Sequence, residues 1–324
     1  MVGVRLVVVG PGLSLGLRRG QVEVRRGREL VERVPLSEVD VIVVSSSSAS
    51  VSARLLYEAG RSGVPLYFAG PRGDLVSVVL PGTPTRTADK YIAQAEWRLN
   101  PGLRLRAAKW FVKGKIRGRV WLLKRLSRGY GLELRDTAWG LEAYYARVVE
   151  ASSIDELRLL EAEAGRRYWA SIVEYTVLGE KGFRARIPRG GDEWNTALDY
   201  AYGLLRGVCH RSLWLAGLYP YMGFMHVEKS GRPSLTLDFM EPYRWLAEWT
   251  VLKYAARKDV VLEPDGSLSR ETRSGLLKAW FKMEESRYPG SRYDVRGVIV
   301  RDAWRLASAL VDGGDWSALP PEGW

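Results

Sequence analysis

The spacing of apolar residues changes once along this chain of 324 residues, and this change restricts what the chain can fold into. In about the first 80 residues, short β-branched runs are bounded by Gly, Pro and Ser, as in strands. Beyond residue 90, apolar residues recur at three- and four-residue steps, as in helices. The segment between, PGTPTRTADK, has two prolines and a glycine that interrupt both patterns. We predict an α+β protein with a small β-rich domain over 1–85 and a larger all-helical domain over 90–324.

The same patterns locate the individual elements. Strands are predicted at Val4–Val9, Leu13–Leu17, Val22–Arg25, Val39–Val44 and Val64–Phe68. Among them, Ser50–Ala59 is predicted to be a helix, because it has a serine-rich start suited to N-capping. Helices of the second domain are predicted at about 90–99, 103–128, 136–149, 155–177, 193–217, 238–257, 270–284 and 298–311.

A strand that leads into glycines, Val7–Gly12, superficially resembles the entry to a dinucleotide-binding loop. That fold requires a helix directly after the glycines, but Leu13–Leu17 alternates with period two. We therefore reject a nucleotide site here.

The chain is strongly basic, with 49 Lys and Arg against 37 Asp and Glu and a net charge of +12. Such a positive field attracts polyanions, either nucleic acid or an anionic membrane surface. Cys209 is the only cysteine, so no disulfide can form within the chain. No uncharged stretch approaches the roughly 20 residues that span a bilayer. We expect a cytoplasmic protein that does not cross a membrane.

Residues 104–128 contain ten Lys and Arg and no acidic residue. In a helix, four of these cations share one face, namely Arg106, Lys109, Lys113 and Arg117. This row is a candidate surface for a DNA backbone, although a basic face is more often simply solvated. Trp110 and Trp121 could stack on unpaired bases, but core positions are the commoner fate of tryptophan.

The strongest chemical signal is a histidine followed by two carboxylates. His226 comes after a helix-breaking segment with Pro220 and Gly223, so it is predicted to project from a turn. Asp238 and Glu241 follow, three residues apart. They could form a capping box at a helix start, with Asp238 as N-cap, and Glu241 could still face a metal. Arg244 is placed to orient Glu241 or to hold a phosphate.

A third candidate ligand is Glu161, whose helix has small neighbours at Ala162, Ala164 and Gly165. Glu163 competes with it, and spacing alone does not separate the two. Two carboxylates and one imidazole suit Mn²⁺ and tolerate Mg²⁺, ions that assist reactions at phosphodiesters.

Four segments in order resemble the blocks of one family, the CRISPR-associated Cas-one proteins: EAEAGRRYW, DEWNTALDYAYGLL, AGLYPYMGFMH and SLTLDFMEPYR. RLRAAKWFVKGKIRGRVWLL resembles the segment that opens the family's helical domain. The likeness covers most of 104–244. One departure is Ala162, where the family commonly has glycine, which leaves Glu163 as the alternative ligand.

The resemblance implies a metal-dependent DNA endonuclease and integrase that inserts short foreign DNA into a CRISPR array by attack of a 3′-hydroxyl on a phosphodiester. It implies a homodimer, with the β-rich domain as the expected dimer contact, and a small Cas-two partner protein. Metal ligation falls on Glu161, His226 and Glu241, with Asp238 as a supporting catalytic residue. Asp192 and Asn195 match a pair that shapes the pocket or touches DNA.

Two other functions remain open on the sequence. A non-catalytic DNA-binding or architectural protein would account for the charge and the basic helix. A related integrase that serves a mobile element would share the metal site and differ in its gene neighbourhood.

Overall fold

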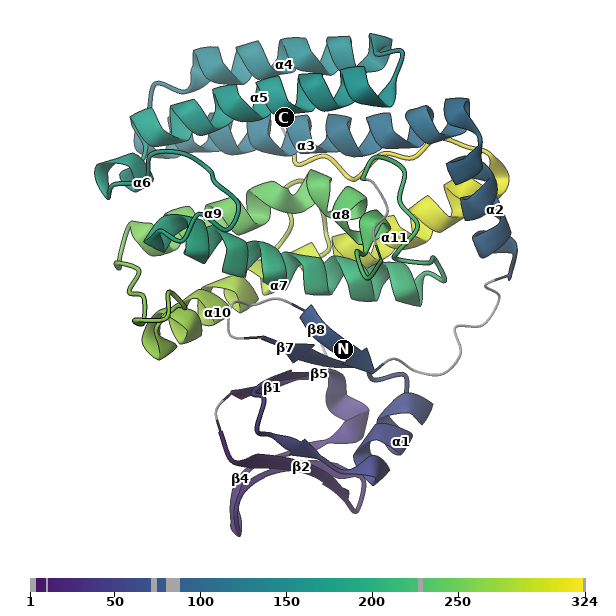
Figure 1. The fold of residues 1–324 in the computed structure, drawn as a ribbon, viewed down its shortest axis with the longest axis vertical. Helices are drawn as coiled ribbons and strands as arrows, with labels where there is room; N and C mark the ends of the chain where they lie inside the picture. Colours follow the sequence, from purple (N-terminus) through teal and green to yellow (C-terminus); the bar gives the residue numbers. More distant parts are fainter. Residues whose placement is uncertain (1–3, 10, 71–74, 80–87, 227–229, 323–324) are drawn as a thin grey trace. The chain divides into compact units, whose positions relative to one another are not determined.

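The computed structural model describes residues 4–9, 11–70, 75–79, 88–226 and 230–322 (Figure 1). It divides into two compact units, Met1–Thr85 and Arg86–Trp324, each with a hydrophobic core of its own. The first unit is rich in strands and the second is helical, so the predicted fold class is confirmed. Most of the predicted linker, 81–87, lies outside the described residues.

Two four-stranded sheets build the first unit. One has the order β1 (Val4–Val9), β5 (Val39–Ser45), β7 (Leu66–Ala69) and β8 (Leu75–Val79), and the other has the order β4 (Glu29–Pro35), β3 (Gln21–Arg26), β2 (Leu13–Arg18) and β6 (Ser50–Val51). Their core contains Leu6, Leu15 and Ile42, all at most 2% exposed.

Strands β4, β6 and β8 were not predicted. β4 lies at a sheet edge with five of its seven residues exposed, so its sequence does not alternate between apolar and polar. β6 takes the first two residues of the predicted helix Ser50–Ala59. The helix itself, α1 (Ala53–Arg61), begins where the Ser52 hydroxyl accepts a hydrogen bond from the Leu55 amide. After Gly12, β2 follows instead of a helix, which agrees with the rejection of a nucleotide loop.

The helical unit is organised around α3 (Pro101–Tyr130), a helix of 30 residues. Helices α4 (Arg135–Glu150) and α5 (Ile154–Tyr175) run along α3, as Figure 1 shows. The others are α2 (Ala88–Leu99), α6 (Val177–Glu180), α7 (Glu193–Leu215), α8 (Ser234–Met240), α9 (Arg244–Ala255), α10 (Arg270–Glu285) and α11 (Val295–Asp312). None of the described helices is both long and apolar enough to cross a membrane.

The single helix predicted over 238–257 is wrong. The chain forms α8, then a 3₁₀ turn, η2 (Glu241–Tyr243), and then α9. Pro242 explains the break, because it has no amide hydrogen to donate and it restricts the residue before it. The interruption matters because it turns the Glu241 side chain toward α3.

Two glycines of α3 allow η2 to lie directly against that helix. A Cβ atom on Gly114 would come within 2.8 Å of the Pro242 ring, and one on Gly118 would lie 2.9 Å from the Pro242 carbonyl oxygen and closer still to the Trp245 ring. Real Cβ atoms essentially never approach so closely. The two glycines, four residues apart, therefore form a flat strip on which the turn containing Glu241 rests.

Candidate active site

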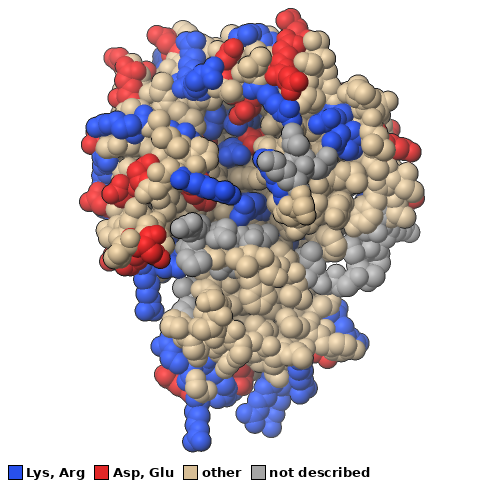
Figure 2. Space-filling view, in the orientation of Figure 1, with Lys and Arg blue, Asp and Glu red and all other residues tan. Residues whose placement is uncertain are grey.

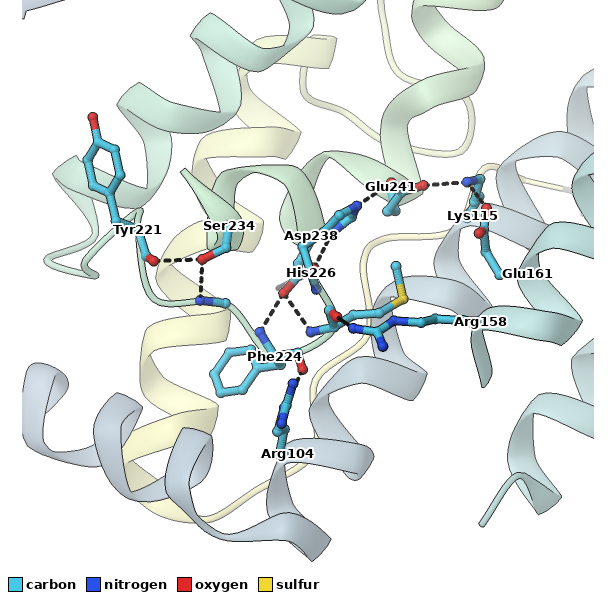
Figure 3. Close-up of polar contacts among 12 residues, drawn as sticks. Arg104, Lys115, Arg158, Glu161, Tyr221, Phe224, His226, Ser234, Asp238 and Glu241 are labelled. Carbon is cyan, nitrogen blue, oxygen red and sulfur yellow. Dashed lines mark hydrogen bonds and ion pairs between the residues drawn. The ribbon is translucent and has the colours of Figure 1, made fainter. Parts of the chain in front are cut away.

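His226 lies in the segment between α7 and α8, and Asp238 of α8 holds residues 224–226 of this segment in place (Figure 3). The Asp238 carboxylate accepts hydrogen bonds from the backbone amides of Phe224 (2.6 Å), Met225 (3.0 Å) and His226 (3.0 Å). One of its oxygens also lies 2.6 Å from His226 Nδ1. The prediction that His226 projects from a turn is confirmed.

The capping box that Asp238 and Glu241 could have formed is absent. Asp238 lies inside α8, fully buried, and binds the His226 loop instead of the amides at a helix start. Because Nδ1 faces this carboxylate, the other ring nitrogen, Nε2, is directed toward Glu241, with 4.0 Å between Nε2 and Oε1. A carboxylate behind an imidazole in this way is the usual support of a metal-binding histidine.

Further contacts fix the path of the loop. The Gly223 amide donates to the Ser234 hydroxyl at 2.9 Å, and Arg104 and Arg158 donate to the carbonyls of Phe224 and Met225 at 2.8 and 2.7 Å. A side chain at position 223 would collide with the Asp238 carboxylate, because a Cβ there would lie 2.7 Å from it. Glycine is therefore required at this position.

Glu241 is a buried carboxylate surrounded by cations. Arg244 binds both of its oxygens at 2.8 Å, and Lys115 Nζ lies 2.7 Å from Oε2. Burial raises the pKa of Glu241, but the charges of Arg244, Lys115 and His226 outweigh it and hold the pKa well below its usual range. Glu241 is ionised at neutral pH, and Arg244 orients it as predicted.

Glu161 reaches the same place from α5. Its Oε1 forms an ion pair with Lys115, so one ammonium group joins the two predicted glutamate ligands. The competing Glu163 points elsewhere and pairs with Arg147 at the surface, at 3.2 Å. Lys115 thus links Glu161 to Glu241, and Glu241 in turn lies 4.0 Å from His226 Nε2.

The donor set is the one expected for a hard divalent ion, with two carboxylates and one imidazole supported from behind. Within the described part of the chain, no three His, Cys, Asp or Glu side chains are close enough to hold an ion as they stand. Lys115 lies between two of the three candidates and forms an ion pair with each of them. The residues fit a divalent metal in kind and direction, provided that this ammonium moves.

A layer of buried charge supports the site. The Tyr202 ring lies near two guanidinium groups, those of Arg244 (4.8 Å) and Arg186 (5.3 Å). The Tyr202 hydroxyl donates to Glu248 at 2.7 Å, and Glu248 is paired with Arg119 at 2.8 Å. These groups restrict the position of Arg244 and, through it, that of Glu241.

The basic row of α3 is not an open surface. Arg106 pairs with Asp315 at 2.8 Å, Lys109 donates to the Val149 carbonyl at 2.7 Å, and Lys113 lies near the Tyr145 ring. Arg117 is buried and donates to Ser317 and Ala318, so its predicted contact with DNA is not compatible with this structure.

The row was predicted from spacing alone, which could not reveal that residues 313–318 contact Arg106 and Arg117 and that α4 lies beside Lys109 and Lys113. Contacts of Arg106, Lys109 and Lys113 with DNA stay predictions. Trp110 and Trp121 belong to the hydrophobic core, as is usual for tryptophan, and not to a surface that stacks on bases.

Asn195 was predicted to shape the pocket or touch DNA, and burial excludes contact with DNA, because it is 1% exposed. Its amide group donates to Ala185 and Asp192, while its oxygen accepts from Arg186 and the Ile187 amide. Asp192 is the N-cap of α7. The pair therefore anchors the loop that carries Arg186 beside Tyr202, which is an indirect part in shaping the site.

Lys115 was missed in the sequence, although a signal was present. On a helical projection, Lys115 and Arg119 fall on the same side of α3 as Ala108, Val112 and Ile116, the apolar face. A cation on a buried face requires an acidic partner from another element. This rule predicts an acidic partner for each cation, and the structure shows these to be Glu161 and Glu241 for Lys115 and Glu248 for Arg119.

Lys and Arg side chains also gather over the middle of the helical unit, on the face shown in Figure 2. Such a concentration is typical of a surface that meets a polyanion.

Comparisons with known proteins agree with the geometry. A family model described as "CRISPR associated protein Cas1" matches residues 6–282. The chain is 32% identical to CRISPR-associated endonuclease Cas1 2 of Pyrobaculum aerophilum over 306 residues, which cover 94% of this chain and 99% of the relative.

Two solved structures share its fold. A casposase bound to an integration product has a TM-score of 0.83 at 20% identity, covering 99% of this chain and 94% of the casposase. A Cas6-RT-Cas1–Cas2 complex has a TM-score of 0.80 at 18% identity, covering 98% of this chain and 36% of that larger polypeptide.

Proposed function

The chain belongs to the Cas-one (Cas1) family of CRISPR-associated proteins, and from this membership we propose that it is a divalent-metal-dependent DNA endonuclease and integrase that inserts short foreign DNA into a CRISPR array. The observation that carries the proposal is the orientation of His226. Asp238 holds Nδ1, and Nε2 is thereby directed to Glu241, beside Glu161, in a protein with a strongly positive charge.

Integration is a transesterification. The 3′-oxygen of the incoming strand forms a bond to a phosphorus of the target, the bond from that phosphorus to its own 3′-oxygen breaks, and the proton of the attacking hydroxyl passes by way of solvent to the departing oxygen. Mn²⁺ or Mg²⁺, when bound, would polarise the phosphodiester and favour loss of that proton. Glu161, His226 and Glu241 would hold the ion.

The other residues have supporting parts in this proposal. Asp238 fixes the ring of His226, and Arg244 fixes the carboxylate of Glu241. Arg244 is 20% exposed and lies against the site, so its outer edge can also contact a DNA phosphate. Arg106, Lys109 and Lys113 remain candidates for contacts with the backbone further along α3.

We further propose that the protein acts as a homodimer with a Cas-two partner. The fold likeness to the Cas1 part of a Cas1–Cas2 complex supports such an assembly. The first unit has an exposed edge strand, β4, which suits a dimer contact.

The decisive experiment is strand transfer of a short DNA duplex into a target plasmid, with Mn²⁺ or with EDTA. The variants Glu161→Gln, His226→Ala and Glu241→Gln should each lower the rate by at least about 100-fold, because each removes a ligand. DNA affinity should change little, since phosphate contacts provide most of it.

Glu163→Gln is the matched control for this experiment. It removes a carboxylate two residues from Glu161 on α5 whose partner is Arg147 at the surface, and it should keep wild-type activity. If all three site variants transferred strands at the wild-type rate in Mn²⁺, the assigned centre would be wrong.

The casposase likeness favours one alternative, an integrase of a mobile element. At 20% identity this likeness concerns the fold only, while the match at 32% is to an endonuclease of the Cas1 family. A CRISPR array and a Cas-two gene beside the coding sequence would support our proposal, and transposon ends would support the alternative. Salt-sensitive binding without any metal-dependent change to DNA would indicate an architectural protein instead.

A further inference from the structure

Lys115 is a buried lysine that touches both glutamates of the proposed metal centre. Its side chain is 9% exposed, and its ammonium group lies 2.7 Å from Glu241 Oε2 and in direct contact with Glu161 Oε1 (Figure 3). Neither carboxylate belongs to the same helix as Lys115. The three groups are brought together by the packing of α3, α5 and η2.

The charges explain why a cation is needed at this point. Two carboxylates that converge in a partly buried place repel each other unless a positive charge lies between them. Arg244 contacts both oxygens of Glu241, whereas Lys115 contacts Glu241 and Glu161 together. Lys115 is therefore the group that allows both glutamates to face the same point.

We infer that Lys115 is an internal counter-ion that fills the place of the divalent metal in the metal-free protein, and that metal loading requires its ammonium group to be displaced. This inference rests on the proposed function, because it takes Glu161, His226 and Glu241 as the ligands. It adds a residue that competes with the ion instead of binding it.

The neighbouring buried cation, Arg119, provides a contrast. Arg119 is paired with Glu248 at 2.8 Å, and its guanidinium lies 4.3 Å from the Tyr168 ring. Both contacts hold the guanidinium in place. Lys115 has a flexible aliphatic stem and a single compact charge. Its partner Glu161 is 24% exposed, whereas Glu248, the partner of Arg119, is 1% exposed.

Two consequences follow for metal binding. The protein should hold its site together without metal, because the glutamates are already neutralised. It should also bind the ion less tightly than the three ligands alone would allow, because the ion must first displace the Lys115 ammonium group, which is paired with both glutamates. Substitution of Lys115 by an uncharged residue should therefore strengthen metal binding, whereas substitution of a ligand weakens it.

The test compares Lys115→Met with Lys124→Met. Lys124 lies on the same helix but outside the site, and its Nζ pairs with Glu142 Oε1 at a distance of 2.7 Å. The Lys124 variant therefore also removes a lysine ion pair from α3. Mn²⁺ binding is measured for each full-length protein by calorimetry and by electron paramagnetic resonance. We expect Lys115→Met to bind Mn²⁺ at least about tenfold more tightly than wild type, and Lys124→Met to match wild type.

Thermal unfolding of the same proteins provides a second readout. Lys115→Met should unfold at a lower temperature than wild type in EDTA, and Mn²⁺ should raise its midpoint by more than it raises that of wild type. The measurement does not depend on catalysis.

Wild-type protein gives a third readout in case the variant does not fold. Acetylation of Lys115, followed by mass spectrometry, should be slow in EDTA and faster in Mn²⁺, while acetylation of Lys124 should not respond to the metal. Unchanged Lys115 labelling would overturn the inference, and so would equal or weaker Mn²⁺ binding by folded Lys115→Met; both would leave the proposed function standing. If neither wild type nor variant bound Mn²⁺, the proposed metal centre itself would be wrong, and the inference with it.

Discussion

At the scale of single residues, the site depends on side chains that act through others. Asp238 is fully buried and cannot contact a substrate. It nevertheless fixes both the backbone conformation at His226 and the orientation of the His226 ring. Arg244 and Lys115 do the same for Glu241. The proposed metal ligands are thus held in position by neighbouring charged groups.

His210, the only other histidine, gives a residue-scale prediction. It lies on α7, 2% exposed, with Nδ1 3.1 Å from the Thr236 hydroxyl. Burial, aided by the charge of Arg206, lowers the pKa of His210 from 6.5 to about 4. As the pH falls below 6.5, the unfolded chain takes up a proton that the folded chain does not, so stability is lost. The loss from this residue should be about 2 kcal/mol between pH 7 and pH 5.

Urea unfolding at these two pH values checks this expectation. His210→Gln should be less stable than wild type at pH 7, but its stability should depend less on pH. The lowered pKa of Glu241 acts at more acidic pH and leaves this window clear. A pH dependence that is the same in wild type and variant would contradict the assignment.

At the scale of elements, local signals predicted most helices well. Asn100 caps α3, Ser153 caps α5 and Asp192 caps α7, and each helix begins within about two residues of its predicted start. The break at Pro242 was missed because the apolar spacing continues through it. The role of Asp238 was missed because its partners lie 12 to 14 residues earlier, in a loop whose path no local rule determines.

The glycine strip of α3 gives the element-scale prediction. Gly118→Ala should push η2 away from α3, lower the free energy of unfolding by about 1–3 kcal/mol and reduce strand transfer, because Glu241 moves with η2. Gly129→Ala is the control on the same helix, since a Cβ at that position meets nothing within 4 Å.

Gly129→Ala should leave activity unchanged and raise stability slightly, by up to about 1 kcal/mol, since alanine favours a helix. Urea unfolding and the plasmid assay measure both effects. Equal behaviour of the two variants would mean that the strip does not position the turn.

At the scale of the whole molecule, two units of different construction are joined in one chain, and only the helical unit contains the candidate site. Composition and periodicity were sufficient for this division. Strand β4 could not be predicted, because this exposed edge strand lacks the alternation that identifies strands.

The proposed dimer gives the whole-molecule prediction. Val31 on β4 is 52% exposed at a sheet edge, and Val31→Lys should weaken dimerisation at least about tenfold, because a lysine at an edge opposes strand pairing. Val76→Lys is the control, since Val76 is 66% exposed on β8, at the edge of the other sheet. Sedimentation velocity over a range of concentrations measures the effect. A dimer of unchanged affinity in Val31→Lys would exclude this strand as the contact.

The segment that covers α3 also bears on how the protein is made. Arg106, Arg117 and Trp121 find their partners in Asp315, Ser317 and Glu322, about 200 residues later in the chain. While the ribosome is still synthesising the intervening helices, these three side chains lack those partners. The packing of α3 therefore cannot be completed until residues 315–322 have been synthesised and have left the ribosome.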